Sequence, residues 1–304
     1  MKKILLTGAS GFIGRQCLSP LIRRGYEVHA TWNNHAATGR DAGGAEWHQV
    51  DLLDRDSVSK LLAQLQPTHL LHSAWYATPG KYWEASENEQ WLDASTHLFR
   101  TFGEVGGQRA VGVGTCAEYD WSFEHYSEFS TPLRPATTYG RCKLQVGTFL
   151  SELENETGLG TAWGRLFFLY GPHEDERRLV ASVITSLLQN EPALCSHGSQ
   201  IRDFLHVEDA GSALVALLDS EVTGPVNIAS GAGTRIRDAV CEIAKQLGQP
   251  NLIKLGSRPA PENEPASLVA DVARLRDDVG WKPEFSLSSG FSETIKWWQA
   301  QLEK

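Results

Sequence analysis

The sequence predicts a doubly wound α/β fold, in which one parallel sheet carries helices on both faces. Short apolar runs alternate with amphipathic helical segments four times in roughly the first 115 residues. Three glycines at a spacing of three, Gly8, Gly11 and Gly14, follow the first of these runs. Parallel strands need crossover connections, and such connections are almost always right-handed.

The first apolar run, residues 3–7, is predicted to be a buried strand that ends in a phosphate-binding turn. Gly8 permits a sharp turn, Gly11 lets the backbone approach a pyrophosphate, and Gly14 lets the next helix pack on the strand. That helix offers N–H groups and the positive end of its dipole to a phosphate. A glycine turn without a ligand is the alternative, which the flanking strand and helix disfavour. The expected dinucleotide contacts in this turn are Gly8, Gly11, Phe12, Ile13, Gly14 and Arg15.

Residues 12–24 are predicted to form the first helix, because their apolar positions recur on one face. Gly25 follows where a C-terminal cap belongs. Pro20 lies inside the segment and removes one backbone hydrogen bond, so we expect an irregular helix there.

The end of the second predicted strand, residues 26–32, bears on the choice of cofactor. An acidic side chain there would bind the ribose hydroxyls of NAD and repel the 2′-phosphate of NADP. The residues that follow are Asn33 and Asn34, which carry no charge, and Arg15 and Arg40 are candidate phosphate partners. This pattern favours NADP(H), with NAD(H) as the alternative.

The third and fourth predicted strands, residues 46–52 and 68–74, flank an amphipathic helix over 57–66. Asp51 is suited to a hydrogen bond with the adenine amino group, and a solvated loop carboxylate is the alternative. Ligands of open α/β sheets bind at the carboxyl ends of strands. The expected cofactor contacts at these ends are Asn33, Asp51, Leu52, Ser73 and Ala74.

An aromatic loop follows the fourth strand, and a helix over 88–102 and a fifth strand over 109–115 follow the loop. The loop either lines a pocket or covers an edge of the core, and the residues leave both open. Its aromatic residues are Trp75, Tyr76, Tyr82 and Trp83.

Three residues form the candidate catalytic group. Thr115 ends the fifth strand, and Tyr139 and Lys143 are four residues apart in a predicted helix. Residues at this spacing lie on one helix face, with about 5–6 Å between their Cβ atoms. A lysine ammonium there would stabilise a phenolate and lower the pKa of Tyr139 from about 10, which would make it an acid or base near neutral pH.

These motifs together resemble the extended short-chain dehydrogenase/reductase family, in its nucleotide-sugar branch of epimerases, dehydratases and reductases. The resemblance extends over the whole chain and includes residues 7–14, 165–172 and 202–209. It implies that Thr115 hydrogen-bonds the reacting oxygen, that Tyr139 transfers the proton, and that Lys143 binds the nicotinamide ribose.

The resemblance also implies a Rossmann domain over residues 1–165 and a smaller α/β domain over 166–304 for a nucleoside-diphosphate sugar, with segments that cross back. The expected substrate contacts are Thr115, Tyr139, Phe168, Arg202 and Arg258.

Arg202 resembles the arginine that meets the substrate diphosphate. Its alternative is an ion pair with Asp203 or Asp209. Arg177 and Arg178 are weaker diphosphate candidates, because the carboxylates of residues 174–176 are available to pair with them.

Departures from the family pattern reduce the number of reactions that we expect of this chain. Cys116 and Ala117 stand where 4,6-dehydratases carry Asp and Glu, so water elimination lacks its acid and base. Ala117 also replaces the cysteine of enzymes that epimerise at C3 and C5, and Phe168 replaces the asparagine of galactose-type 4-epimerases. We therefore expect an NAD(P)H-dependent reduction of a nucleoside-diphosphate 4-keto-6-deoxy sugar. The alternatives are a redox-neutral NAD-dependent 4-epimerase and a non-catalytic NADP-binding sensor.

In the second half, helices are predicted over 179–189, 236–247 and 291–301, with another after Gly211. The residues 226–229 are predicted to form a short strand, and 270–275 a helix followed by a turn. The proline-rich stretch 259–265 is an ordered loop or a mobile connection.

Composition excludes several classes. A net charge of -9 disfavours nucleic acid as a partner, and no stretch reaches membrane-spanning length. The five cysteines are scattered along the sequence, and no two of them have the spacing of a Cys-x-x-Cys motif. We therefore expect no disulfide framework and no metal site, and we expect a cytoplasmic location. The resemblance implies a homodimer that packs through residues 88–102 and 139–153.

Overall fold

A computed structural model describes residues 2–33, 44–260 and 264–303. Its larger sheet has seven strands, and every neighbouring pair runs parallel. The strands follow the order β11-β7-β5-β4-β1-β2-β3, so the chain adds β2 and β3 on one side of β1 and the later strands on the other side. This is the topology of a doubly wound fold, and it confirms the predicted fold class. The strands are β1 (Lys3–Thr7), β2 (Glu27–Trp32), β3 (Ala45–Gln49), β4 (His69–His72), β5 (Arg109–Thr115), β7 (Gly160–Leu166) and β11 (Gly224–Ile228).

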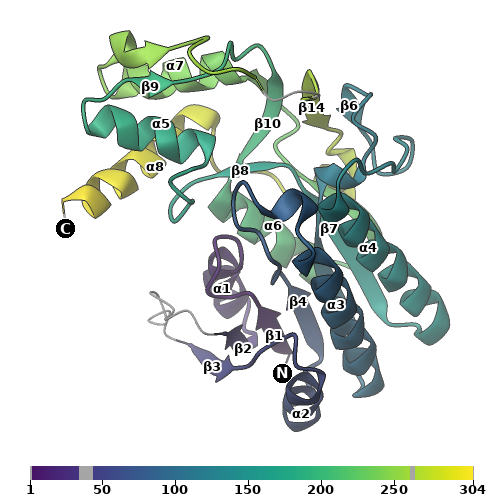
Figure 1. Ribbon diagram of the computed structural model, residues 1–304. Coiled ribbons are helices and arrows are strands. Elements are labelled where there is room, and N and C mark those ends of the chain that lie inside the picture. The colour runs from purple at the N-terminus through teal and green to yellow at the C-terminus, as the bar shows by residue number, and fades with distance from the viewer. Residues whose placement is uncertain (1, 34–43, 261–263, 304) are drawn as a thin grey trace.

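Helices cover both faces of this sheet (Figure 1). On one face α1 packs against α6, and their apolar residues share a core with β1, β2 and β11. On the other face α3 lies between α2 and α4, over a second core. These helices are α1 (Gly14–Arg23), α2 (Arg55–Leu65), α3 (Glu87–Glu104), α4 (Thr138–Thr157) and α6 (Val207–Asp219).

A smaller sheet and three helices form the second part, drawn at the top of Figure 1. The strand order is β12-β10-β14-β6, with β8 also on β10, while β13 and β9 form a separate pair. The strands are β6 (His125–Tyr126), β8 (Phe168–Tyr170), β9 (Ala193–Leu194), β10 (Ile201–His206), β12 (Gly233–Arg235), β13 (Ile253–Lys254) and β14 (Ser267–Ala270). The helices are α5 (Leu179–Leu188), α7 (Ile236–Gln246) and α8 (Leu287–Leu302), and the short helical turns are η1 (Tyr82–Glu84), η2 (Cys116–Glu118), η3 (Pro250–Leu252) and η4 (Arg274–Asp278).

The chain passes more than once between these parts. After β8 and β10 it returns to the larger sheet through α6 and β11, which pairs with β7. The division into domains at residue 165 remains a proposal.

Several predicted boundaries move. The third strand ends at Gln49 and the fourth at His72, so the four cofactor candidates beyond them lie in the connections that follow these strands; they are Asp51, Leu52, Ser73 and Ala74. The helix expected over 270–275 begins later, as the helical turn η4 from Arg274, because Ala270 ends β14, where Asn227 and Asp203 bind the backbone of residues 271 and 270 and hold it extended. Pro20 is buried inside α1, as its position predicts. Among the described residues, we find no helix with the length and apolar character needed to cross a membrane.

Candidate active site

The turn after β1 has the close packing that its glycines predict. Gly8 has a φ of +70°, and a Cβ built on it would lie 2.7 Å from the backbone nitrogen of Ala74. A Cβ on Gly14 would lie 2.2 Å from the carbonyl oxygen of Gly8. The helix α1, which the structure describes in full, has no side-chain cap at Ile13 and no acidic residue in its first turn. The cradle therefore suits a dinucleotide pyrophosphate.

Two polar side chains support this turn. The Arg15 guanidinium donates to the carbonyl oxygens of Ser10 and Gly11, at 2.8 and 3.2 Å. The Ser73 hydroxyl donates to the carbonyl oxygen of Thr7 at 2.7 Å, which joins the ends of β1 and β4. Both candidates thus lie beside the turn, as expected.

The end of β2 is neutral where the structure describes it. The Asn33 amide donates to the Asp51 carboxylate at 3.4 Å, and Asp51 also accepts from the backbone of Leu53 at 3.0 Å. Asn34 and Arg40 lie outside the described residues. The apolar candidates around the turn are the partly buried Phe12 and Ile13 and the buried Leu52 and Ala74.

Thr115 and Tyr139 meet at the carboxyl end of β5, where their side chains share a hydrogen bond. The backbone of Ala117 also donates to Thr115 Oγ1, at 3.2 Å. The Thr137 hydroxyl caps α4 by accepting from the backbone of Gly140, and a Cβ on Gly140 would lie 2.4 Å from the Ala117 carbonyl oxygen. This contact seats the first turn of α4 on η2, which brings the two side chains together.

The aromatic loop lines the site around Tyr139. The rings of Trp75, Tyr82 and Trp83 present edge-to-face contacts to the Tyr139 ring, with centroids 6.4, 4.8 and 5.8 Å away. Tyr82 is buried, and Trp83 is 37% exposed and also contacts Trp121. The loop therefore covers the core and walls the site at once.

Lys143 lies one helical turn after Tyr139 and is 3% exposed. Its Nζ donates to the carbonyl oxygen of Val113 at 2.8 Å and lies 3.9 Å from the centre of the Trp75 ring. Burial lowers the pKa of Lys143 to about 7, against the opposing charge of Glu118. Near neutral pH this amine is therefore only partly protonated.

The expected lowering of the pKa of Tyr139 is wrong for this structure. Burial raises the pKa of Tyr139, and the hydrogen bond from Thr115 offsets this only in part. Lys143 is turned to Val113 and Trp75, so its charge does not serve the phenol here. The phenol consequently keeps its proton at neutral pH and is suited to donate it.

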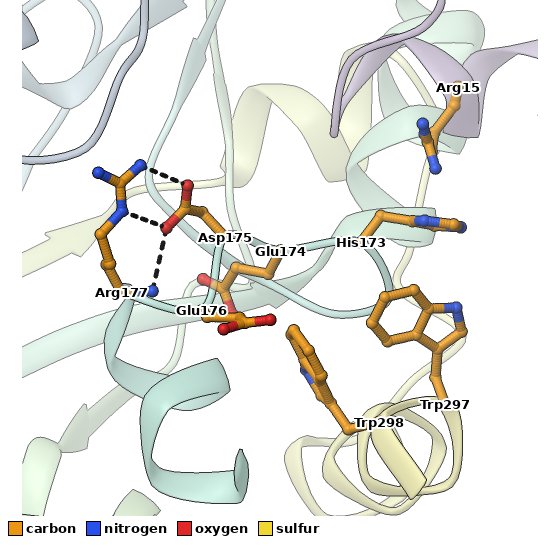
Figure 2. Close-up of a pocket in the computed structure, with 8 residues that line it drawn as sticks. All are labelled: Arg15, His173, Glu174, Asp175, Glu176, Arg177, Trp297 and Trp298. Atoms are coloured by element: carbon orange, nitrogen blue, oxygen red, sulfur yellow. Dashed lines mark hydrogen bonds and ion pairs between the residues drawn. The ribbon is translucent and has the colours of Figure 1, made fainter. Parts of the chain in front are cut away.

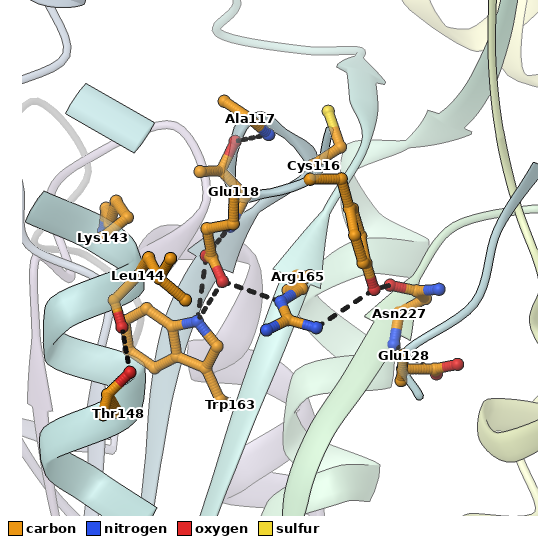
Figure 3. A network of polar contacts seen from close by, with 12 residues as sticks. Cys116, Ala117, Glu118, Glu128, Lys143, Leu144, Thr148, Trp163, Arg165 and Asn227 are labelled. Carbon is orange, nitrogen blue, oxygen red and sulfur yellow. Dashed lines mark hydrogen bonds and ion pairs between the residues drawn. The ribbon is translucent and has the colours of Figure 1, made fainter. Parts of the chain in front are cut away.

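Glu118 is tied into a buried network (Figure 3). Its Oε1 accepts from the Thr115 backbone at 2.8 Å and from Trp163 Nε1 at 2.9 Å, and its Oε2 accepts from Arg165 Nε at 2.7 Å. Arg165 also donates to the Tyr119 hydroxyl at 3.1 Å. The carboxylate is completely buried, so its role is to hold the end of β5 in place.

Arg202 is buried in β10, with 1% of its surface exposed. Its guanidinium donates to the Glu264 carboxylate at 2.7 Å and to the Ile201 carbonyl oxygen at 2.7 Å, and it lies 5.2 Å from the Phe168 ring centre. Its Nε has no hydrogen-bond partner among the described residues. Phe168 and Arg202, both substrate candidates, thus lie together.

The proposed alternative partners of Arg202 are wrong. Asp203 accepts from the backbone and hydroxyl of Ser230, at 2.8 and 2.6 Å. Asp209 accepts from the backbone of Glu284 and Phe285, at 2.9 and 3.0 Å. Both carboxylates bind loops, because each faces backbone N–H groups that burial leaves without water.

The other arginine candidates make contacts of their own. Arg258 is exposed, and its backbone donates to the Cys195 carbonyl oxygen at 3.2 Å. Arg177 makes a two-point ion pair with Asp175, at 2.8 and 2.7 Å, as the alternative for it predicted. Arg178 hydrogen-bonds Tyr82 and so reaches the aromatic wall.

A cavity of 560 Å³ opens between α1, the segment after β8, and α8 (Figure 2). None of Thr115, Tyr139 and Lys143 is among the described residues that line it, so the chemistry of the site lies elsewhere. Glu174 lines the cavity but is 5% exposed, and burial raises the pKa of Glu174 to about 8 against the charge of Arg178. The lining residues are Arg15, His173, Glu174, Asp175, Glu176, Arg177, Trp297 and Trp298.

Sequence reasoning missed His72, which ends β4 beside the site. Its ring nitrogens lie 2.6 Å from the Thr7 hydroxyl and 2.8 Å from the Ser95 hydroxyl. Burial and the charge of Lys143 lower the pKa of His72 to about 3, so it is neutral. The available signal was a histidine at the carboxyl end of a fully buried strand that reads His-Leu-Leu-His.

The fold and site define a dinucleotide-binding α/β enzyme whose tyrosine and threonine converge at the carboxyl end of β5. The model of the NAD dependent epimerase/dehydratase family matches residues 4–229, and the chain belongs to that family. The predicted family and its dependence on a nicotinamide dinucleotide are thereby confirmed.

Individual relatives are distant but extend over the whole chain. UDP-glucuronic acid decarboxylase 1 of Xenopus tropicalis is 26% identical over 99% of this chain and 73% of its own length. UDP-glucose 4-epimerase of Streptomyces lividans is 25% identical over 97% of this chain and 95% of its own. The crystal structure of UDP-glucose 4-epimerase from Thermotoga maritima superposes with a TM-score of 0.88 at 22% identity and covers 99% of both chains.

Proposed function

We propose that this protein reduces the 4-keto group of a nucleoside-diphosphate 4-keto-6-deoxy sugar. NADPH supplies the hydride to the carbonyl carbon and leaves as NADP⁺. Tyr139 gives its proton to the carbonyl oxygen, so that the ketone becomes an alcohol, and Thr115 hydrogen-bonds the same oxygen. Lys143 is proposed to bind the nicotinamide ribose, for which its Nζ must exchange the carbonyl oxygen of Val113 for a ribose hydroxyl, and solvent restores the proton of Tyr139 after turnover.

The observation that carries this proposal is the chemistry beside Thr115. Cys116 and Ala117 follow it, and burial raises the pKa of Cys116 to about 12, so this thiol is no base. Both oxygens of Glu118 are occupied by buried donors. Water elimination and epimerisation next to the ketone need an acid and base at these positions, whereas ketone reduction needs only the proton of Tyr139.

Two features support NADPH as the reductant. Asn33 provides a neutral end to β2, where an acidic residue would repel the 2′-phosphate. The candidate phosphate partner Arg15 lies beside the turn after β1, where its guanidinium donates to the carbonyl oxygens of Ser10 and Gly11.

Arg202 is proposed to bind the substrate diphosphate. A diphosphate would take the place of the Glu264 carboxylate and give the unpartnered Nε of Arg202 an acceptor. Phe168, which lies against the guanidinium, would then contact the bound nucleotide sugar. Arg258 is the second candidate for the diphosphate.

A redox-neutral 4-epimerase is the second candidate function. The similarity to UDP-glucose 4-epimerases favours it, and such a reaction at C4 also needs no acid or base beyond Tyr139. An epimerase retains NAD and returns the hydride to the same sugar. A sensor role is disfavoured because Tyr139 and Lys143 are both present.

One experiment distinguishes the reductase from the epimerase. Purified protein is extracted for bound nucleotide and then incubated with NADPH or NADH and a panel of nucleoside-diphosphate 4-keto-6-deoxy sugars. We expect NADPH oxidation in proportion to the alcohol formed. Tightly bound NAD, with C4 inversion of a UDP-hexose and no NADPH loss, would establish the epimerase instead.

We further propose a cytoplasmic homodimer with the domain division near residue 165. The helices α3 and α4 lie side by side, and each has a partly exposed aromatic side chain, Trp91 in α3 and Phe149 in α4, which suits a helix-to-helix contact between two copies.

A further inference from the structure

Strands β2 and β3 bring two histidines and a glutamate together at the edge of the larger sheet. His29 pairs with Glu46 in the register, and His48 lies two residues further along β3, on the same face. His29 Nδ1 is 2.9 Å from His48 Nε2. The Glu46 carboxylate oxygens lie 3.7 Å from these same two nitrogens. The three ligand atoms all fall within 4.8 Å of one another.

A hydrogen bond to Glu27 fixes the orientation of the His29 ring. Its Nε2 lies 3.0 Å from the Glu27 carboxylate, which accepts that proton and leaves the lone pair of Nδ1 directed at the cluster. Lys3 lies 3.5 Å from the same carboxylate and holds it in place. Histidines that bind metals usually donate their other N–H to a carboxylate in this way, since the bond sets the tautomer and increases the basicity of the ligand.

The cluster has spare ligand capacity. Without a cation, His48 must donate its Nε2 proton to His29 Nδ1, and this bond gives the Glu46 carboxylate no role. His29 is 4% exposed, so the inner ligand of the cluster is buried. Glu27 and Glu46, countered by Lys3, leave a local negative charge for a cation.

We propose that His29, His48 and Glu46 bind a divalent transition-metal ion of the Zn²⁺ class. Two imidazole nitrogens and one carboxylate are a known zinc ligand set, with water in the remaining position. A tetrahedral site with bonds of about 2.0–2.1 Å places its ligand atoms roughly 3.3 Å apart. The 3.7 Å distances to Glu46 must shorten by a few tenths of an ångström, which its 68% exposed side chain is free to do, and the 2.9 Å between the two rings must lengthen by a similar amount through the partly exposed His48.

Bound there, the ion would tie the edge strand β3 to β2 through side chains in addition to their backbone ladder. Cysteine spacing could not predict it, because the ligands are two histidines and a glutamate. His29 lies 19 residues before His48 in the sequence, and only the pairing of β2 with β3 brings them together. The inference is independent of the proposed reaction, and its readouts need no turnover.

Zinc binding to the full chain, prepared without an affinity tag and stripped with a chelator, tests the proposal. Zn²⁺ is titrated against a chromophoric chelator, and Co²⁺ is added as a spectroscopic probe. We expect one equivalent of Zn²⁺ to bind, visible d–d absorption from Co²⁺, and a higher melting temperature with Zn²⁺. Glu46→Gln and His48→Gln should each weaken binding at least 10-fold.

Two further variants sharpen the result. Glu27→Gln keeps all three ligands and should weaken binding by about 10–100-fold, because only the support of His29 changes. His125→Gln alters an exposed histidine on β6 and should bind like the wild type. Far-UV circular dichroism of each metal-free variant checks that it folds.

No saturable equivalent in the wild type would overturn the proposal. So would unchanged affinity in both Glu46→Gln and His48→Gln, or a loss of binding in His125→Gln, since either result places the metal elsewhere. Glu46 is largely exposed, so its variant remains informative if His48→Gln fails to fold.

Discussion

Tyr139 derives its proposed role from its surroundings more than from its spacing to Lys143. Three aromatic rings and the Thr115 hydroxyl enclose the phenol, and burial raises the pKa of Tyr139. The Lys143 ammonium instead donates to the carbonyl oxygen of Val113 and lies over the Trp75 ring. A protonated phenol next to a threonine hydroxyl is the arrangement that a proton donor requires.

Replacing Tyr139 by Phe should lower turnover by about 10²–10⁴ while NADPH binding is retained, because proton donation contributes roughly this factor. Steady-state kinetics and fluorescence titration with NADPH measure the two effects. Tyr26→Phe is the matched control, since it also removes a hydroxyl, which binds Asp219 far along the sequence from Tyr139. Wild-type turnover in Tyr139→Phe would remove this residue from the chemistry.

Glu174 makes a pH-dependent contribution to stability. Burial raises the pKa of its folded-state carboxyl from 4.5 to about 8. Between these values the unfolded chain has lost this proton and the folded chain retains it, so stability falls as pH rises. Glu174→Gln should therefore increase the free energy of unfolding by about 1–3 kcal/mol at pH 8 and by little at pH 5.

Urea unfolding at the two pH values measures this difference. Glu176→Gln alters an exposed neighbour and should show no change between pH 5 and pH 8 relative to wild type. An equal effect of Glu174→Gln at both pH values would mean that its carboxyl does not hold a proton in the fold.

Residue spacing predicted which side chains meet but not how they are partnered. Thr115 and Tyr139 converge as the sequence indicated, because a strand end and a helix start are local features. The Glu264 partner of Arg202 and the side chains of Trp163 and Arg165 that donate to Glu118 come from distant segments. Such partners depend on tertiary packing, which no local pattern encodes.

At the scale of elements, the turn between β1 and α1 depends on an absent side chain. A Cβ at Gly14 would collide with the carbonyl oxygen of Gly8 at 2.2 Å, and backbone has little room to move. Gly14→Ala should destabilise the fold by about 1–3 kcal/mol and weaken NADPH binding.

Thermal unfolding and NADPH titration check this expectation. Gly103→Ala is the control within α3, where a new Cβ would meet Leu159 at an ordinary 3.8 Å. It should be neutral or should stabilise by about 0.5–1 kcal/mol, because alanine is a better helix former. Equal behaviour of the two variants would contradict the close packing of the turn.

The sequence predicted helices and strands correctly where the segment was long enough to show a clear hydrophobic period. The predicted strand 109–115 coincides with β5, and the predicted 179–189 helix ends one residue beyond α5. Strands such as β6, β9 and β13 have two residues each, which is too short for an alternating pattern. Their pairing with distant strands defines them.

At the scale of the whole molecule, α3 and α4 lie side by side on one flank and form the proposed dimer surface (Figure 1). Light scattering of the wild type should give twice the mass of one chain. Phe149→Asp should shift it to monomer, because a carboxylate would be buried in the interface. Phe129→Asp is the control, because Phe129 is 76% exposed, and this variant should remain a dimer. A monomeric wild type at micromolar concentration would contradict the dimer.

The central claim is that hydride enters the sugar from outside and that Tyr139 protonates the resulting oxygen. NADPH deuterated at the transferable C4 position, incubated with a nucleoside-diphosphate 4-keto-6-deoxy sugar, tests it most directly by mass spectrometry of the product. We predict one deuterium at sugar C4 in the wild-type product and a strongly reduced rate in Tyr139→Phe. A product without deuterium at C4, formed with no loss of NADPH, would contradict the account.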